Sequence, residues 1–133
     1  MTDWVTDIAN FIRQDANWEN SAFAYQMPEN APDPSVMIIP PIKGLQYDLY
    51  LPNRYRGPFQ ALIRTKDIAS AHSKAAEILR MLEVVNTQMG DLNVVRIVPT
   101  ITPIVYPKSD SDLYEASVNF EIIMIDTRIK TGT

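Results

Sequence analysis

Residues 59–85, FQALIRTKDIASAHSKAAEILRMLEVV, decide the fold, because a strand signal is followed there by the clearest helix signal in the chain. Residues 59–64 are predicted to form the strand. After Asp67, whose carboxylate can cap a first helical turn, apolar residues recur at steps of three and four: Ile68, Ala71, Ala75, Ile78, Leu82 and Val85. This spacing puts them on one stripe of a helix, which we expect to end near residues 86–88.

The composition of this helix indicates what it packs against. The small side chains of Ala71, Ala75 and Ala76 allow close approach to a flat partner, and a sheet is the natural candidate. Charged residues fall on the opposite face, where Glu77 is three positions before Arg80 and can form a weak ion pair with it. The helix is therefore predicted to lie on one face of a sheet.

The remaining elements follow from periodicity and from proline positions. Residues 3–14 form a predicted amphipathic helix capped by Thr2 or Asp3. Strands are predicted at residues 23–27, 36–39, 92–98 and, as a bent or edge strand, 101–106. Residues 47–51 can also extend along a sheet edge, and residues 108–112 form a polar turn. The order predicts an α+β fold, a mostly antiparallel β-sheet with two helices packed on one face.

Residues 114–126 give the clearest strand signal. Apolar and polar side chains alternate along it, so one face is predicted to be buried. The alternation is lost at Ile123 and Ile125, where both faces become apolar. Something must cover the second face there, and a neighbouring subunit is one candidate.

Composition narrows the class of protein. The chain has 133 residues, 46% hydrophobic and 21% charged, which indicates one folded domain over residues 1–133, with residues 127–133 as a loose tail. It has no cysteine, which excludes disulfides and thiolate metal sites. No apolar run has the length of a membrane span, and the acidic, amphipathic start is not a signal peptide. A net charge of −4 argues against a dedicated nucleic-acid binder.

Candidate catalytic and metal-binding groups are few. The only histidine, His72, has Ser70 and Ser73 nearby in sequence, but these point in other directions on a helix, so no triad is indicated. Asp110 and Asp112 form a DxD that lacks a third carboxylate, so a solvated turn is the simpler interpretation. We find no glycine-rich phosphate loop and no HExxH. No enzyme activity, cofactor or metal is predicted.

A basic and aromatic segment stands out in this acidic chain. Residues 40–58 are rich in proline and tyrosine and suggest an ordered, protruding loop. An ordinary surface loop is one interpretation and a protein contact is the other, because tyrosine and arginine are enriched at binding hot spots. Stacking on nucleic acid fits the net charge less well. The candidate interface consists of residues from this segment and of the two isoleucines at the end of the last strand. These residues are Lys43, Tyr47, Tyr50, Arg54, Tyr55, Arg56, Ile123 and Ile125.

Three stretches resemble a known family: AFAYQMP at residues 22–28, FQALIRTKDIASAHSKAAEILRMLE at 59–83 and VVRIVPTITPIVYPKSDSDLYEASVNFEI at 94–122. The pattern is similar to that of the tail terminator and minor capsid proteins of long-tailed bacteriophages. The most telling parts are the strand ending in Arg64, the helix led by Asp67, and YEASVNFEI. Residues 40–58 have no counterpart in the resemblance.

The resemblance implies a structural virion protein. Such proteins assemble in the host cytoplasm as a ring, expected to be a hexamer, at the head-proximal end of the tail. The ring ends polymerisation of the tail tube protein and joins the tail to the head connector proteins. It implies no enzyme activity, no cofactor, no membrane and no sequence-specific nucleic acid, and it leaves room for DNA to pass through the ring. A closed ring needs two different surfaces on each subunit, for which the end of the last strand and residues 40–58 are candidates.

Two other functions stay open from the residues. One is a small-molecule-binding or catalytic domain that uses His72 and nearby carboxylates. The other is a monomeric adaptor that binds another protein through residues 40–58.

Overall fold

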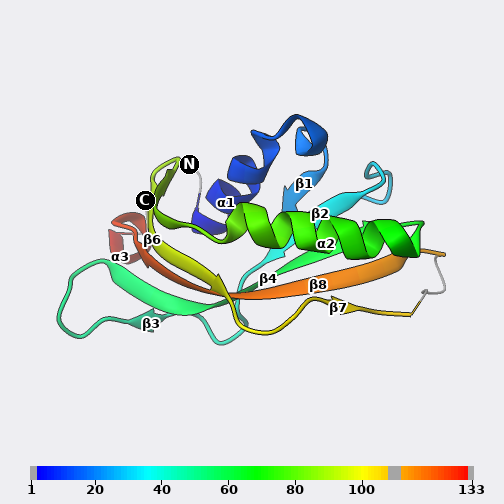
Figure 1. Ribbon diagram of the computed structural model, residues 1–133. Helices are drawn as coiled ribbons and strands as arrows, with labels where there is room; N and C mark the ends of the chain where they lie inside the picture. Colours follow the sequence, from blue (N-terminus) through cyan, green and yellow to red (C-terminus); the bar gives the residue numbers. More distant parts are fainter. Residues whose placement is uncertain (1–2, 108–111, 132–133) are drawn as a thin grey trace.

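The computed structural model describes residues 3–107 and 112–131, which form one curled sheet with helices on one side (Figure 1). Six strands form the main path, in the order β1-β2-β4-β8-β6-β5, and two short strands, β3 and β7, pair with β4 and β8. The strands are β1 (Ala22–Ala24), β2 (Ser35–Ile39), β3 (Gln46–Tyr47), β4 (Arg54–Thr65), β5 (Val85–Met89), β6 (Leu92–Pro99), β7 (Ile104–Val105) and β8 (Tyr114–Ile125). The β1–β2 pair is parallel and the other pairs are antiparallel, so the predicted α+β class is confirmed.

The pairing of β4 with β8 is the centre of the sheet. The two 12-residue strands are in register from Arg54 opposite Ile125 to Thr65 opposite Tyr114. Because side chains alternate between the faces, one face carries a buried apolar set: Tyr55, Phe59, Ala61, Ile63, Ala116, Val118, Phe120, Ile122 and Met124. The predicted alternation along the last strand is therefore confirmed.

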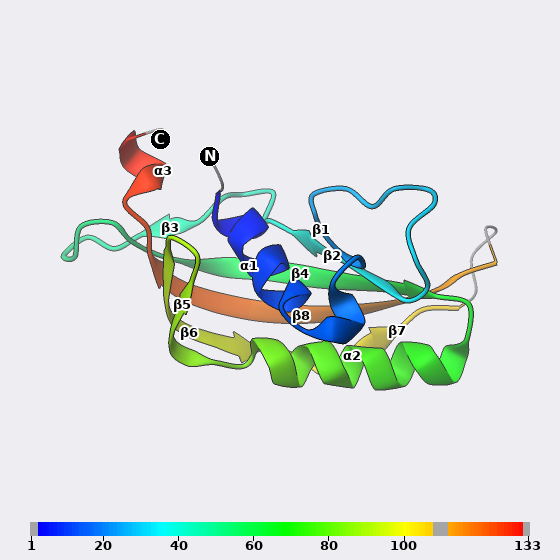
Figure 2. The same ribbon diagram turned by 90° about the horizontal axis from the view of Figure 1, so that it is seen from above.

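Two main helices cover this apolar face (Figures 1 and 2). They are α1 (Trp4–Arg13) and α2 (Ile68–Leu82), with a short 3-10 helix at Ala16–Trp18. The Asp67 carboxylate accepts from the Ser70 N–H at 3.2 Å, and Asp3 accepts from Thr6 at 2.8 Å. Both predicted caps are present. The stripe Ala71, Ala75, Ile78 and Leu82 is fully buried against β4, β6 and β8.

The predicted helix is too long at its C-terminal end. It stops at Leu82, and Val85 begins β5 with an exposed side chain. Val85 lies three positions after Leu82 in the sequence, so it continued the spacing of the helical stripe by coincidence. The chain turns away because Glu83 is extended, Asn86 has a φ of 47°, and the Val84 carbonyl accepts from the Ile97 N–H. Ile68, expected in the core, is half exposed at the first turn of the helix.

Strand boundaries also differ from the expectations. The central strand begins at Arg54 rather than residue 59, because Arg54–Gly57 pair with β8 as far as Ile125. The loop expected at 40–58 therefore ends at Asn53, before β4, and is interrupted by β3. The extension expected at 47–51 is limited to β3, which ends at Tyr47. The strand expected at 23–27 is only β1, since Tyr25 has a φ of 70°. The one expected at 101–106 is reduced to β7, and most of the expected turn at 108–112 lies outside the described residues.

The C-terminal segment contains a short helix, α3 (Arg128–Thr131), where we expected a loose tail. The Arg128 guanidinium holds it in place by binding the Asp7 carboxylate of α1 at 2.6 Å and both Asp126 oxygens at 2.8 and 3.0 Å. Both carboxylates are buried and the Arg128 side chain is 13% exposed, and the hydrogen bonds with Asp126 raise the pKa of Arg128. The absence of a side chain at Gly90 allows Asp7 to lie close to the backbone there, because a Cβ at this position would be 2.8 Å from the Asp7 carboxylate.

Trp18 ties the 3-10 helix to α2. Its indole N–H donates to the Glu77 carboxylate at 2.9 Å, and Lys74 binds the other carboxylate oxygen at 3.1 Å. Glu77 was expected on the exposed face beside Arg80, but its side chain is partly buried, with 26% of its surface exposed. Burial raises its pKa, yet the bonds from Trp18 and Lys74 outweigh burial and leave the pKa below its ordinary value.

Replacing Arg128 should destabilise the protein strongly. Arg128→Ala leaves the Asp7 and Asp126 carboxylates buried without their cation, which should lower the free energy of unfolding by about 3 kcal/mol. The matched control is Lys130→Ala on the same helix, where an exposed side chain should cost less than about 1 kcal/mol. Denaturant unfolding measures both, and equal losses would contradict the assigned role of Arg128.

The Glu77 contacts should make stability depend on pH. Because its pKa is lowered by folding, the carboxylate contributes stability above its ordinary pKa of 4.5, and this contribution is lost as pH falls through the lower folded value. Glu77→Gln removes the titration, while the other carboxylates are unchanged. Thermal unfolding should show wild type more stable than Glu77→Gln at pH 7, with the difference shrinking below pH 4.5. A constant difference would argue against this charge effect.

Candidate functional site

The groups that could have supported catalysis do not form a site. His72 is exposed on α2, and the Ser73 hydroxyl donates to the Ser70 carbonyl of its own helix rather than to His72. Asp112 has a φ of 63°, and Asp110 lies outside the described residues. Within residues 3–107 and 112–131, no cluster of three or more His, Cys, Asp or Glu side chains could hold a metal ion. In the same part of the chain, no helix is long and apolar enough to cross a membrane.

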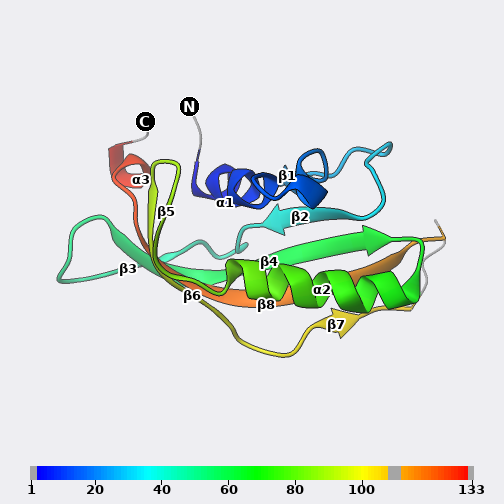
Figure 3. The same cartoon turned by 45° about the horizontal axis from the view of Figure 1, so that its top comes forward.

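The candidate site is instead the sheet face opposite the helices, which we call the open face. Neither α1 nor α2 covers it (Figure 3). Its side chains are the alternate set of β2, β4, β6 and β8, and ion pairs between described residues lie along it. Arg54 and Asp48 are 3.7 Å apart, Arg56 and Glu121 are 4.0 Å apart, and Arg64 binds Glu115 at 2.7 Å. These pairs are partly exposed, so they contribute little to stability and keep a polar surface available.

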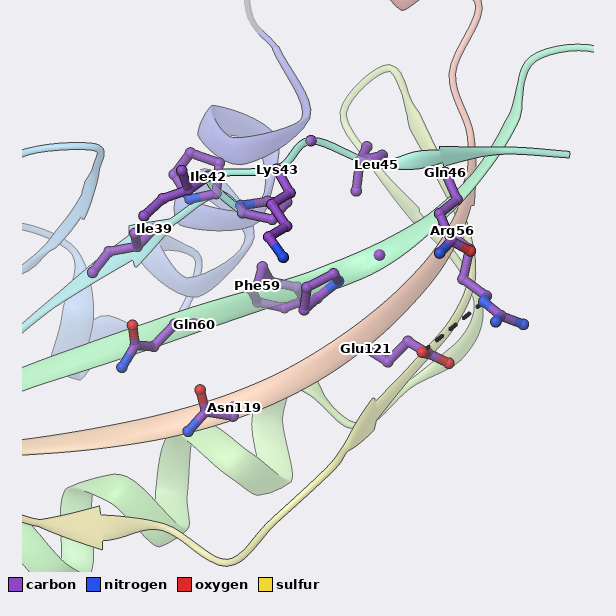
Figure 4. A pocket seen from close by; sticks show the side chains of 15 residues that line it. Ile39, Ile42, Lys43, Leu45, Gln46, Arg56, Phe59, Gln60, Asn119 and Glu121 are labelled. Carbon is purple, nitrogen blue, oxygen red and sulfur yellow. Dashed lines mark ion pairs between the residues drawn. The ribbon is translucent and has the colours of Figure 1, made fainter.

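A groove lies where the chain leaves this sheet between β2 and β3 (Figure 4). It has a volume of about 580 Å³ and lies between residues 39–46 on one side and residues 56–60, Asn119 and Glu121 on the other. Apolar side chains, among them Ile39, Ile42 and Leu45, form much of one wall. The Arg56–Glu121 pair lies at one end, and Gln60 and Asn119 supply amide groups. The groove can therefore hold apolar side chains and orient them with a few polar contacts.

The groove exists because β2 and β3 pair with different parts of β4. β2 pairs as far as Gln60 and β3 starts at Arg56, which leaves residues 57–59 without a partner on that side. Pro58, which has no N–H to donate, lies in this gap. Leu45 packs over Gly57, where a Cβ would lie 2.6 Å from its side chain. The lack of a side chain at Gly57 thus sets how closely residues 40–45 approach the sheet.

The turn between β3 and β4, residues 48–53, is a second exposed feature, which we call the tip. Its apolar side chains point into solvent: Leu49 is 88% exposed, Tyr50 90% and Leu51 48%. The Asp48 carboxylate accepts from the backbone N–H groups of Tyr50 and Leu51 at 2.8 and 3.0 Å. These hydrogen bonds lower the pKa of Asp48 and keep the turn in one conformation.

Most of the predicted interface residues come together near the tip. Tyr47, Arg54, Tyr55, Arg56 and Ile123 line one cavity of about 250 Å³, with Gln46 and Asp48. Ile125 is opposite Arg54 in the sheet register. Tyr50 is on the tip, and Lys43 lines the groove. Ile42, Leu49 and Leu51 were not among the residues predicted from the sequence. Their positions in a stretch without strand or helix periodicity could have indicated that these apolar side chains are exposed.

Tyr55 is far more buried than its neighbour Tyr47, which is 63% exposed. It is 2% exposed and points to the helix side, where its ring is 5.5 Å from that of Tyr47. Its hydroxyl has no hydrogen-bond partner among the described residues, and burial raises its pKa. It belongs to the core rather than to an exposed patch.

Removing the Tyr55 hydroxyl should not harm the fold. Burying an unpartnered hydroxyl costs about 1–3 kcal/mol, so Tyr55→Phe should leave the free energy of unfolding unchanged or raise it. Tyr106→Phe is the control, because the Tyr106 hydroxyl is 3.2 Å from that of Ser117 and its loss removes a bond. Denaturant unfolding distinguishes them, and a loss of stability in Tyr55→Phe alone would reveal a partner for its hydroxyl.

Comparison with known proteins agrees with a structural role. Residues 12–124 match the family model described as bacteriophage tail terminator protein. Among solved structures, the fold is similar to a chain in a structure titled "Virion of native gene transfer agent (GTA) particle", with a TM-score of 0.67 and 14% identity, covering 92% of this chain and 94% of that one. No curated protein matches the sequence. Because the family match spans most of the chain, the protein belongs to the bacteriophage tail terminator family, whose members are structural, non-enzymatic components of the virion tail.

Proposed function

We propose that this chain forms a closed ring at the head-proximal end of the tail tube, where it ends tube polymerisation and joins the tail to the head. Membership of the tail terminator family supports this. The resemblance in sequence supports it too, because that resemblance implies a ring, which is expected to be a hexamer. The partners are further copies of the chain, the tail tube protein and the head connector proteins.

One observation carries the proposal: a single chain presents two different surfaces that have no partner among its described residues. The tip carries exposed apolar side chains, and the open face carries the groove and the partly exposed Ile123 and Ile125. Large apolar side chains held in solvent on a rigid turn are typical of interaction sites. Two unlike surfaces are also what a head-to-tail interface needs, and such an interface generates a ring when its rotation closes.

The ion pairs of the open face fit a polar rim around an apolar contact. In each of the pairs Arg56–Glu121 and Arg64–Glu115, the arginine and the glutamate neutralise one another within one chain. A neighbouring copy therefore does not have to supply a countercharge for them. Interfaces are usually built this way, with apolar anchors at the centre and hydrated polar groups around them.

Charge placed on the open face should block assembly while the fold is retained. Ile123→Asp replaces an apolar side chain of this face with a charge that loses its water when a neighbouring molecule covers it, and Arg56 and Arg96, which lie opposite residue 123, offset only part of that cost. We therefore expect Ile123→Asp to reduce head-joined tails by about tenfold or more. The matched control is Ser73→Asp on the exposed side of α2. Each variant is supplied in place of the wild type during particle assembly, and electron microscopy counts joined particles and tube lengths, with thermal unfolding as the fold check.

The outcome separates the proposed functions. Unjoined heads together with tubes of irregular length in Ile123→Asp alone would support the ring at the tube end. Normal particles with Ile123→Asp, or a single copy of the chain per particle, would contradict it. A single copy would favour the monomeric adaptor that acts through residues 40–58.

A further inference from the structure

We propose that neighbouring copies in the ring are joined by insertion of the tip of one copy, residues 48–53, into the groove of the next. The inference rests on the proposed ring and assigns the surfaces that form it. The occupant of the groove is therefore a second copy of this chain, and each groove is incomplete without Leu49, Tyr50 and Leu51 of its neighbour.

The two surfaces match in chemistry. The groove has an apolar wall built from Ile39, Ile42 and Leu45, and the Ile42 side chain is fully exposed on its rim. The tip presents two leucines and a tyrosine. At about 580 Å³ the groove has room for several side chains. The Tyr50 hydroxyl can bond to the amides of Gln60 or Asn119, as a tyrosine does when an apolar body is buried beside a polar edge.

The tip is rigid before it binds. Asp48 accepts two hydrogen bonds from the turn, its own N–H donates to the Arg54 carbonyl at 3.1 Å, and the Asn53 carbonyl accepts from the Asp126 N–H at 2.9 Å. The three apolar side chains are thus held outward at little further loss of chain entropy when they bind. A turn that served only to connect β3 with β4 would not need large apolar residues in solvent.

A copy cannot place its tip in its own groove. The tip extends beyond Arg54 at one end of β4, whereas the groove lies along the strand from Arg56 to Gln60. At 3.3 Å per residue, the groove therefore extends from roughly 7 Å to roughly 20 Å along the strand from Arg54. The turn between β3 and β4 extends beyond the end of the sheet, away from β2 (Figures 1 and 3). The contact therefore has to be made between copies. Such a head-to-tail contact repeats and can close into a ring.

Charge favours the same pairing. Lys43 on the groove wall is exposed and has no ion-pair partner in the described part of the chain. The tip carries the Asp48 carboxylate, whose Oδ2 atom lies 3.7 Å from the Arg54 Nε atom. This distance is longer than a hydrogen bond, so Oδ2 can still accept a hydrogen bond from a second cation. Insertion of the tip would bring an anion to a wall that carries an unpaired cation, which helps to set the register of the contact.

The contact is expected to be weak between two isolated copies. Three side chains in one groove bury far less than the roughly 1,200 Å² of a stable pairwise interface. Closure of a ring makes the last contact intramolecular and raises the overall affinity without a new contact. Covalent trapping is therefore a more suitable test than a dissociation constant.

The chain has no native cysteine, so engineered pairs report a single contact. Two singly substituted proteins are mixed at high concentration under mild oxidation, Tyr50→Cys with Gln60→Cys. The control mixture is Tyr50→Cys with Ser73→Cys, whose second position is on the exposed side of α2. A disulfide needs Cα atoms within about 7 Å, so the first mixture should give about tenfold or more mixed dimer than the control. A chain that carries both Tyr50→Cys and Gln60→Cys should form a covalent ladder that ends at a closed ring.

Each result has a defined meaning. Mixed dimer at the control level would overturn the assignment of the tip to the groove. If the uncrosslinked protein still forms rings by mass measurement, the proposed function survives and only this contact is wrong. The thiol of the Tyr50→Cys variant is also probed in assembled particles with a thiol-modifying reagent. Protection of that thiol, without a disulfide between the Tyr50→Cys and Gln60→Cys variants, would mean that the tip binds another virion protein, and this too would overturn the inference.

Discussion

The long antiparallel pairing of β4 with β8 is the constraint on which the rest of the structure depends. Its register decides which residues face the helices and which face outward, because a slip by one residue would exchange the two sets. Phe59 and Phe120 stack with ring centroids 5.1 Å apart on the helix side, and Arg64 binds Glu115 on the open side. The same register ends with Arg54 opposite Ile125, which places the tip just beyond the sheet.

Because of that pairing, the two faces of the sheet have different roles. The helix face holds the apolar core and is closed at its end by Arg128, which links α1, the end of β8 and α3. The open face therefore does not have to supply core stability, and its partly exposed ion pairs, its groove and the tip are available for other molecules. This separation suits a structural component, because an interface can change in composition without unfolding the domain.

Much of the fold could be predicted from local patterns, and the failures have physical causes. Period-two alternation identified the last strand, and the Asp67 cap with the alanine stripe identified α2. Val85 continued a helical spacing by coincidence, and no local signal showed that the Val84 carbonyl bonds across to β6. The start of β4 was hidden because RYRGP has poor strand propensity, and only its long-range pairing with β8 makes it a strand. The exposed aromatic and basic residues were found from composition, but Tyr55 was placed among them although it faces the core.

The account depends on the helix-free side of the molecule being the side that meets other subunits. Hydroxyl-radical footprinting of the free chain and of the chain within assembled particles measures this directly. We predict that Ile42, Leu49 and Tyr50 become protected in the particle, while His72 on the exposed side of α2 is modified equally in both. Protection of α2 with unchanged modification of the tip and the groove would contradict the account.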